Sequence, residues 1–271
     1  MRLLWSKEIK EDNAWLPEYE GYFLKIKDKV VFFYDRTSGP CMLVQDQLYA
    51  ETIYKETPEC RLPLPTRWKL LYAEESSYLQ FAEDTVLDLK TMEVISSPAV
   101  NIQAVHQRHQ FSETDYINKS FHYGEYCISH KGEWGYSCHK DGRVMWEFKG
   151  YGWLYTDILF WKNRLFFGTA GQGGYFYVLD LETGNLLTKI KTGGTKSFVQ
   201  AENLCYVLCN EKNARLICVD LQNGKVREKL ELPGKSKESS IVKIIDSKIH
   251  TTTFEIKKDR LVSTFWNCVD V

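Results

Sequence analysis

The chain has 271 residues with 35 basic and 36 acidic side chains, which gives a formal net charge of −1. Because charges of both signs are mixed along the sequence, no single-sign field is available to attract nucleic acid or anionic lipid. No apolar run approaches the ~20 residues that span a bilayer, and residues 1–13 lack the apolar segment of a secretory signal. We therefore expect a cytoplasmic protein that binds neither nucleic acid nor membranes.

Aromatic residues make up 14% of the chain, and such rings fit the half-buried faces of β-sheets. Only 7 prolines occur, and no Gly-, Ser- or Pro-rich linker separates the chain into compositional halves. All-β folds of this length are common as single domains. The composition therefore favours one all-β domain, residues 1–271, without an internal boundary.

A short motif, in which an apolar strand leads through Asp into a Gly turn and a second strand, recurs along the chain. Its clearest copy is residues 175–187, and shorter copies are residues 86–92, 218–224 and 268–271. The acidic position recurs at intervals of roughly 40 to 50 residues, which is typical of propeller repeats. Its occupants are Asp46, Asp88, Cys138, Asp180, Asp220 and Asp270.

In chain order, the repeat predicts four-stranded antiparallel blades at residues 14–58, 66–98, 105–149, 150–193, 194–233 and 234–271. The first two blades are short and regular. A polar insertion at residues 98–119 follows them, and the third blade then has a hairpin turn at Asp141-Gly142. The fourth blade is the best formed, and the fifth repeats its pattern.

The sixth predicted blade lacks its fourth strand at the end of the chain, and we expect residues 1–10 to supply it. Residues 2–7 resemble residues 143–148, which form the fourth strand of the third blade. Pairing of the N-terminal segment beside the last strand would close the ring and remove exposed sheet edges. The sequence therefore predicts a monomeric six-bladed β-propeller closed by its N-terminal strand.

The full repeat consists of an aliphatic pair, Asp-Leu, a polar pair, Gly, a polar residue and a further aliphatic pair. This pattern, carried well by two units, resembles the repeat of pyrroloquinoline-quinone-type β-propellers. The resemblance implies a propeller fold. A quinone enzyme of that superfamily would be an exported, usually eight-bladed propeller with calcium and an acidic catalytic residue. Roughly six units, no expected export signal and no adjacent cysteine pair favour a non-catalytic member without a cofactor.

Four side chains near one predicted hairpin are of the types that bind zinc, namely Cys127, His130, Cys138 and His139. With the turn at residues 131–134, we expect Cys127 opposite Cys138 and His139 on the other face. Four ligands could not converge in that arrangement, so we interpret the two cysteines as paired core thiols and assign no metal. All 8 cysteines are expected to be reduced in the absence of export.

Three further features receive structural interpretations. The repeated Asp is expected to accept hydrogen bonds from its own turn backbone rather than to act in catalysis. Trp5 and Trp146, at equivalent places in outer strands, are expected to anchor neighbouring blades. Residues 168–174 are rich in Gly but have strands on both sides, so they predict a hairpin turn rather than a phosphate cradle, which would need a helix.

These observations favour a non-enzymatic scaffold that binds a protein partner through loops on one face of the propeller. A bacterial immunity protein that neutralises a toxin and a scaffold of a complex both fit, and the sequence does not select between them. The predicted contact residues are large rings and imidazoles in the loops between blades. They are Trp15, Tyr19, Trp68, His106, His109, Tyr116, Tyr151 and Trp153.

The alternative function is a carbohydrate-active hydrolase or lyase with its site in the central funnel of the propeller. Such an enzyme would need two or three carboxylates that converge there. The acids placed near inner strands are Glu74, Glu75 and Asp157, and Glu125 and Asp246 lie at strand ends.

Overall fold

A computed structural model describes the protein over most of its length, and all helices or strands among the described residues are β-strands. The described residues are 1–14, 22–26, 29–36, 39–46, 51–55, 69–72, 78–82, 85–88, 93–96, 103–107, 120–131, 135–154, 156–171, 173–210, 213–237, 240 and 242–271. None of them belongs to a helix that could cross a membrane. The predicted all-β fold class is confirmed.

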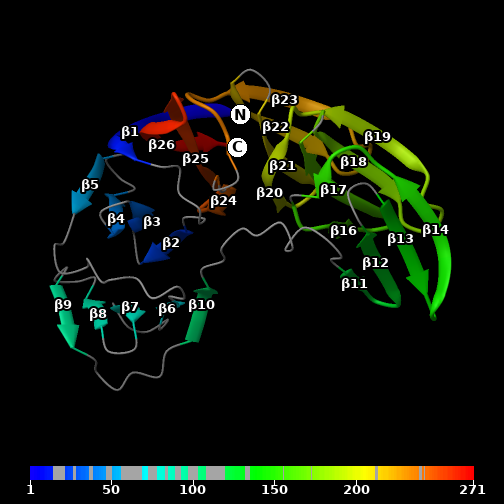
Figure 1. The fold of residues 1–271 in the computed structure, drawn as a ribbon, viewed down its shortest axis with the longest axis horizontal. Helices are drawn as coiled ribbons and strands as arrows, with labels where there is room; N and C mark the ends of the chain where they lie inside the picture. The colour runs from blue at the N-terminus through cyan, green and yellow to red at the C-terminus, as the bar shows by residue number, and fades with distance from the viewer. Residues whose placement is uncertain are drawn as a thin grey trace. The chain divides into compact units, whose positions relative to one another are not determined.

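The strands divide between two compact units (Figure 1). The larger unit combines Met1–Asn13 with Phe111–Val271, and the smaller unit is Ala14–Gln110. The larger contains four antiparallel sheets and the smaller contains two. In three of these sheets every strand pairs with its neighbours in the sequence, in the up-and-down order of propeller blades, and in each of the other three one pairing joins strands that are not consecutive.

The first two sheets of the larger unit are consecutive in the sequence. The β11–β14 sheet is built from β11 (Ser120–Tyr123), β12 (Tyr126–Lys131), β13 (Gly135–Lys140) and β14 (Arg143–Lys149). The β15–β19 sheet is built from β15 (Trp153–Leu154), β16 (Leu159–Trp161), β17 (Arg164–Ala170), β18 (Tyr175–Asp180) and β19 (Leu186–Lys191). In the second of these, β15 and β16 both pair with β17.

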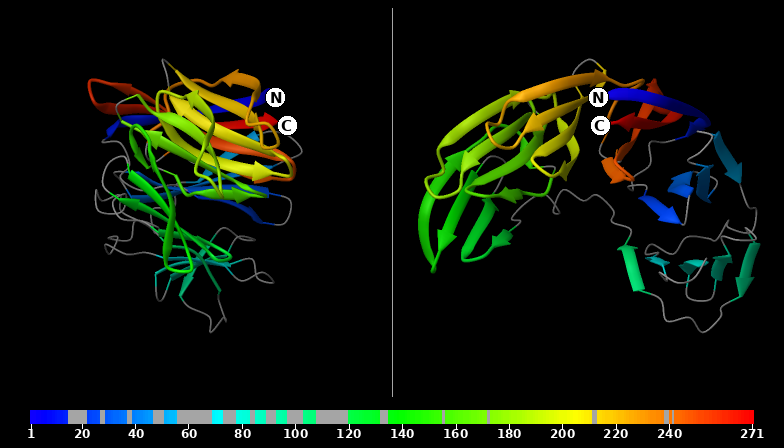
Figure 2. Two further views of the ribbon diagram at one scale, coloured as in Figure 1. Left: turned by 90° about the vertical axis from the view of Figure 1, so that its right-hand side faces the viewer. Right: turned by 180° about the vertical axis from the view of Figure 1, so that it is seen from behind.

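Two more sheets complete the larger unit (Figure 2). The β20–β23 sheet is built from β20 (Thr195–Ala201), β21 (Leu204–Asn210), β22 (Ala214–Asp220) and β23 (Val226–Glu231). The terminal sheet is built from β24 (Val242–Ile245), β25 (Lys248–Lys257), β26 (Arg260–Asp270) and β1 (Arg2–Ala14).

The smaller unit has one sheet of four strands and one of five. The first contains β2 (Tyr22–Ile26), β3 (Lys29–Arg36), β4 (Gly39–Asp46) and β5 (Glu51–Lys55). The second contains β6 (Lys69–Tyr72), β7 (Tyr78–Ala82), β8 (Thr85–Asp88), β9 (Glu93–Ser96) and β10 (Gln103–Gln107). The insertion at residues 98–119 was expected to be irregular, but residues 103–107 of it form β10, which pairs with β6.

Apolar clusters join successive sheets of the larger unit, because side chains alternate between the two faces of a strand. In β17, Leu165 and Phe167 pack in one cluster with the β11–β14 sheet, whereas Phe166 packs in another with the β20–β23 sheet. A third cluster joins Tyr206 and Leu208 of the β20–β23 sheet to the terminal sheet. The middle sheets are therefore buried on both faces.

The N-terminal strand is hydrogen-bonded to the last strand of the chain, as the sequence predicts. Ser6 Oγ donates to the Asn267 side-chain oxygen at 2.7 Å, and the Asn267 amide donates to Thr253 Oγ1 at 3.0 Å. Thr253 in turn donates to the carbonyl of Pro233 at 2.6 Å. Asn267 and Thr253 are fully buried, so this chain of hydrogen bonds fixes β1 through the interior of the sheet.

The repeated Asp accepts hydrogen bonds from the backbone of its own turn, which confirms the prediction for two of its copies. Asp180 Oδ1 accepts hydrogen bonds from the backbone N–H groups of Glu182 and Thr183, at 3.1 and 2.9 Å. Gly184 follows at φ +70° and donates its N–H to the Asp180 carbonyl at 2.9 Å. Since only Gly adopts this φ without strain, Asp and Gly together define the turn.

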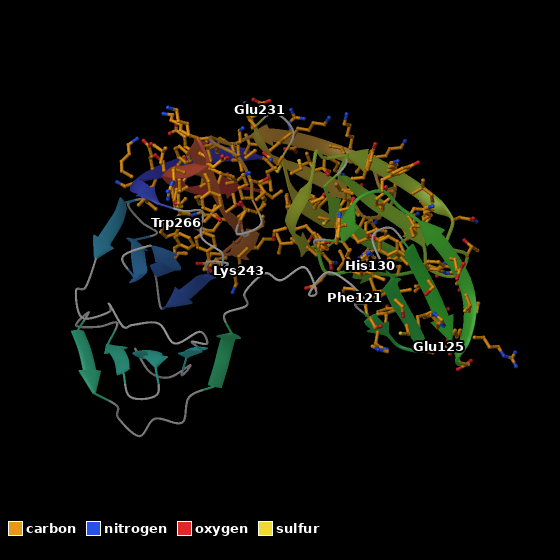
Figure 3. All side chains as sticks on the ribbon, in the orientation of Figure 1. Phe121, Glu125, His130, Glu231, Lys243 and Trp266 are labelled. Atoms are coloured by element: carbon orange, nitrogen blue, oxygen red, sulfur yellow. The ribbon has the colours of Figure 1, made fainter. Side chains whose placement is uncertain are left out.

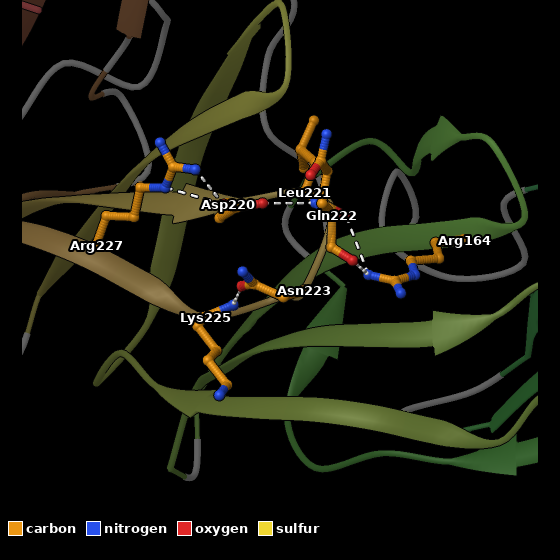
Figure 4. A network of polar contacts seen from close by, with 7 residues as sticks. All are labelled: Arg164, Asp220, Leu221, Gln222, Asn223, Lys225 and Arg227. Atoms are coloured by element: carbon orange, nitrogen blue, oxygen red, sulfur yellow. Dashed lines mark hydrogen bonds and ion pairs between the residues drawn. The ribbon is translucent and has the colours of Figure 1, made fainter.

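The equivalent turn of the next sheet forms hydrogen bonds with residues outside the turn as well (Figure 4). Asp220 is buried and accepts hydrogen bonds from the N–H of Gln222 at 2.7 Å and from Arg227 Nε at 2.9 Å. Arg164 of the β15–β19 sheet donates to the carbonyls of Leu221, at 3.1 Å, and Gln222. This turn therefore joins two sheets.

Trp146 connects the β11–β14 sheet to the next one, as predicted for an anchor between neighbours. Its Nε1 donates to the Leu181 carbonyl at 2.8 Å. Its ring lies so close to Gly184 that a Cβ there would be 2.5 Å from Trp146 Cδ2. Trp5, at the equivalent place in β1, instead packs edge-on against Trp266 of its own sheet, with centroids 5.4 Å apart.

Candidate functional site

The structure describes three of the eight predicted contact residues. Trp15, Tyr19, Trp68, His109 and Tyr116 lie outside the described residues. His106 lies in β10 opposite Leu70, at a register shift, rather than in a loop. Only the backbone of His106 is described, so the predicted patch is represented by Tyr151 and Trp153.

Tyr151 lies in the connection between β14 and β15, whereas Trp153 is the first residue of β15 rather than a loop residue. Two glycines, Gly150 and Gly152, allow close packing of this segment. A Cβ at Gly150 would be 3.3 to 3.6 Å from the rings of Tyr136, Phe148 and Tyr177. Gly152 has φ +85°, and a Cβ there would be 2.5 Å from the Ala170 carbonyl oxygen. The connection is therefore held tightly against the two sheets that it joins.

Hydrogen bonds on both sides fix the backbone of Tyr151. Its N–H donates to the Tyr177 hydroxyl oxygen at 2.8 Å, and its carbonyl accepts from Thr169 Oγ1 at 2.7 Å. The side chain of Tyr151 is nevertheless 55% exposed. Trp153 is half-buried and pairs with Ala170. A large ring is thus presented to solvent from a backbone that has little freedom.

The ammonium of Lys189 lies among three tyrosine rings. Lys189 Nζ is 3.9 Å from the ring centroid of Tyr175, 4.7 Å from that of Tyr151 and 5.8 Å from that of Tyr177. Each distance is within the range in which a cation is attracted to the face of an aromatic ring. We refer to Tyr151, Tyr175, Tyr177 and Lys189 as the tyrosine-lysine cluster.

A β-bulge brings Lys189 to the tyrosine face of the sheet. Leu187 is the extra residue between the pairs Val178–Thr188 and Leu179–Leu186, so Lys189 lies opposite Tyr177. Without the bulge, Lys189 would lie opposite Phe176, and its side chain would point to the other face. Tyr175 shares the face of Tyr177 because the two are separated by two positions.

The segments that converge on the cluster are basic. Residues 148–154, 173–177 and 186–192 contain three lysines, Lys149, Lys189 and Lys191, and no Asp or Glu. Within the described part of the chain, Lys189 contacts aromatic rings but forms no ion pair with a carboxylate. Lys189 therefore carries a positive charge on an aromatic surface, and no carboxylate of the described residues compensates it.

The predicted register of the Cys127 hairpin is wrong by one residue. Cys127 lies opposite His139, and Cys138 lies opposite Ile128 in the core, so the two cysteines are not paired. Cys127 Sγ is instead 3.9 Å from His122 Nε2. Among the residues that the structure describes, no three His, Cys, Asp or Glu side chains are placed to hold a metal ion.

Five of the six thiols that the structure describes are buried, and Cys127 is partly buried. Burial raises the pKa of the Cys138 thiol to about 11 and that of Cys268 to about 11, so both are protonated at neutral pH. Thiolates are the reactive form of cysteine. These two side chains therefore act as small core residues rather than as nucleophiles.

The acids of the hydrolase alternative lie on separate elements. Glu125 forms an ion pair with Lys140 at the turn between β11 and β12, far along the chain from Asp246 in the turn between β24 and β25 (Figure 3). Asp157 is exposed before β16, and Glu74 and Glu75 lie outside the described residues. The described part of the chain contains no group of three His, Cys, Asp or Glu side chains that could hold a metal ion, so it does not bring Glu125, Asp157 and Asp246 together.

Comparison with known proteins yields structural similarity alone. No family model and no curated protein matches the chain. The crystal structure of BamB from Moraxella catarrhalis is 13% identical, with a TM-score of 0.41, over 90% of this chain and 68% of that chain. The computationally designed Ika4 protein is 13% identical, with a TM-score of 0.41, over 58% of this chain and 92% of that chain. Because both TM-scores are below 0.5, these similarities carry no argument about function.

Proposed function

We propose that the protein is a non-enzymatic scaffold that binds a protein partner through the surface around Tyr151. The exposed ring of Tyr151 on a backbone fixed by two hydrogen bonds carries this proposal. Large amphipathic rings are over-represented among residues that dominate binding energy. A fixed backbone reduces the ordering entropy that binding would otherwise cost.

We further propose that the antiparallel sheets are six blades of one ring, closed by the pairing of β1 with β26, in a cytoplasmic monomer. The up-and-down sheet order and the pairing of the N-terminal strand support this arrangement. Deletion of residues 1–8 should then lower the thermal unfolding temperature strongly. An unchanged unfolding temperature would contradict closure by this strand.

The partner is found by crosslinking the tagged protein in cells of its source and identifying the captured proteins by mass spectrometry. Capture of a toxin would indicate an immunity protein, and capture of assembly components would indicate a scaffold. Tyr151→Ala should lose the captured partner while keeping the unfolding temperature of the parent protein. Tyr123→Ala is the matched control, because Tyr123 is also exposed, at 43%, but stacks on Phe160 outside the tyrosine-lysine cluster. Equal capture by both variants would contradict the proposed surface.

A further inference from the structure

The tyrosine-lysine cluster holds its charge in a defined position. Lys189 is exposed, yet its ammonium lies over the rings of Tyr175 and Tyr151 at 3.9 and 4.7 Å. An exposed lysine ordinarily samples many rotamers, and a ligand must order it upon binding. Ring contacts that already restrict Lys189 lower this cost and make it a better anchor than a free surface lysine.

The next sheet has a lysine at the position of Lys189 and shows how the neighbouring cross-strand pair on the same face looks when its charges are compensated. The two sheets can be aligned on their equivalent Asp turns. In this alignment the cross-strand pair Ile217–Lys229 corresponds to the cross-strand pair Tyr177–Lys189. Two positions away, the pair Tyr175–Lys191 corresponds to Arg215–Glu231. Arg215 and Glu231 form an ion pair at 3.4 Å.

The β15–β19 sheet therefore has a tyrosine and a second lysine where its neighbour has an internal ion pair. No carboxylate of the described residues neutralises Lys189. An anionic group of another molecule is the complement that this surface lacks.

We propose that Lys189 binds a carboxylate of the partner protein, from an Asp or Glu next to an apolar side chain that packs on Tyr151. This inference rests on the proposed protein-binding function and specifies the chemistry of the partner. A lysine–carboxylate contact beside aromatic rings is partly shielded from water, which strengthens it. The tyrosine rings supply an apolar contact area, and the Lys189 ammonium favours a negatively charged group of the partner.

A cationic ligand that binds to the faces of the three tyrosine rings is disfavoured by the same observations. Lys189 already occupies the ring faces, and Lys149 and Lys191 lie in the segments that surround it. A second cation would have to displace the Lys189 ammonium and approach Lys191, which lies opposite Tyr175. Recognition of a basic or methylated lysine segment is therefore an outcome that would overturn the proposal.

The test uses random peptides displayed on phage and selected against the intact protein, against Lys189→Gln and against Lys229→Gln. Gln removes the charge and keeps most of the side-chain stem, and Lys229 is the lysine at the equivalent position of the next sheet. Circular dichroism and thermal unfolding confirm that both variants are folded. The parent and Lys229→Gln proteins should enrich peptides with Asp or Glu beside an apolar residue.

One enriched peptide is then measured by fluorescence anisotropy in its acidic form and with the acid replaced by its amide. Lys189→Gln should weaken the acidic peptide by ~30-fold or more, as expected when one member of a shielded charge pair is removed. The amide peptide should bind the parent and Lys189→Gln proteins equally. Equal binding of the two peptide forms by the parent, enrichment of basic peptides, or no enrichment at all would each overturn the proposal.

The outcome also separates this inference from the proposed function. If crosslinking captures a partner through Tyr151 and Lys189→Gln retains it at full affinity, the function stands and the carboxylate contact is wrong. If acidic peptides bind at Lys189 but no cellular partner depends on Tyr151, the contact chemistry stands and the proposed function is wrong.

Discussion

The β15–β19 and β20–β23 sheets share one backbone plan but present different surfaces. Both have an Asp turn closed by Gly, at Asp180 and Gly184 and at Asp220 and Gly224, and both have a bulge at the start of the outer strand. In the second sheet, the bulge residue Arg227 returns to bind Asp220. In the first, the bulge residue is Leu187, which is exposed.

The difference teaches that the repeat determines the turns and the packing, while the outer surface varies independently. Arg215 and Arg227 of the β20–β23 sheet both have carboxylate partners within that sheet. The equivalent places of the β15–β19 sheet are occupied by Tyr175 and Leu187. A surface of this kind, aromatic and apolar beside unpaired positive charge, is available for another molecule.

The largest expected effect concerns the contact between successive sheets. Trp146 packs on Gly184, and Thr188 occupies the corresponding place against Gly224. Trp146→Ala should lower the free energy of unfolding by about 3 to 5 kcal/mol, because it leaves a cavity and an unpaired Leu181 carbonyl. Thr188→Ala should cost less than about 1 kcal/mol. Urea unfolding of both variants measures the difference, and comparable losses would show that Trp146 is no special anchor.

A second prediction extends the comparison to the terminal sheet. Phe166, Tyr206 and His250 occupy equivalent positions, opposite Val178, Cys218 and Cys268. Burial lowers the pKa of His250 from its ordinary 6.5 to about 4, and the Lys248 charge adds to the effect. The Trp266 indole N–H donates to His250 Nδ1 at 3.1 Å, which requires that nitrogen to be unprotonated.

The unfolded chain therefore binds this proton at a higher pH than the folded protein does. Stability should be complete above pH 6.5 and should fall by about 3 kcal/mol as the pH drops to 4. His250→Phe introduces the ring found in the β15–β19 sheet and should remove this part of the pH dependence, although it leaves the Trp266 donor unpaired. Urea unfolding at several pH values tests this, and an equally steep dependence in His250→Phe would contradict it.

The two Asp turns should differ in their contribution to stability. Burial disfavours the charged form of Asp220, but hydrogen bonds from Gln222 and Arg227 outweigh it and hold the pKa of Asp220 below its ordinary value. Asp220→Ala should cost about 2 to 3 kcal/mol, because it removes charge-assisted hydrogen bonds, whereas Asp180→Ala at the exposed turn should cost about 1 kcal/mol.

Acid should reduce the cost of losing Asp220. A lowered carboxyl pKa stabilises the protein above the ordinary value of about 4, and this stabilisation is lost as the pH falls through the folded-state pKa. Thermal unfolding at neutral pH and in acid should therefore show the parent protein approaching Asp220→Ala below pH ~4. A gap that stays constant would mean that Asp220 acts through packing alone.

The smallest expected effect comes from replacing the bulge residue of the β15–β19 sheet by the residue type found at the bulge of the β20–β23 sheet. Leu187→Arg places a guanidinium where it can reach Asp180, as Arg227 reaches Asp220. Because Asp180 is partly exposed, the stabilisation should be ~0.5 kcal/mol or less. A destabilised Leu187→Arg would indicate that the exposed leucine packs more than its surface area suggests.

Much of the fold could be predicted from the sequence because local chemistry determines it. Asp and Gly at fixed spacing specify the turns, and alternating apolar residues specify which strand faces are buried. The resemblance of residues 2–7 to residues 143–148 was sufficient to place β1 beside β26. The strand β10 was missed because residues 103–107 show no clear alternation of apolar and polar side chains. They are recognised as a strand by their pairing with β6.

The candidate site was predicted in part for the same reason. Tyr151 and Trp153 were found because they lie where one repeat passes into the next, although Trp153 belongs to β15 rather than to a loop. Lys189 and Tyr175 were missed because their meeting depends on the bulge at Leu187, which shifts the register by one residue. The Cys127 pairing was predicted one residue away from its true position for a different reason: Lys131, which was assigned to the turn, pairs with Gly135 and extends the hairpin by one residue.

The most direct test of this account is the dissociation constant of the captured partner, measured in parallel for the parent protein, Lys189→Gln and Lys229→Gln. The two lysines occupy equivalent positions in sheets of the same plan, so they differ mainly in the tyrosines around Lys189. Lys189→Gln should bind the partner ~30-fold or more weakly, and Lys229→Gln should bind it as the parent protein does. Equal dissociation constants for the two variants would contradict the claim that Lys189 binds a carboxylate of the partner.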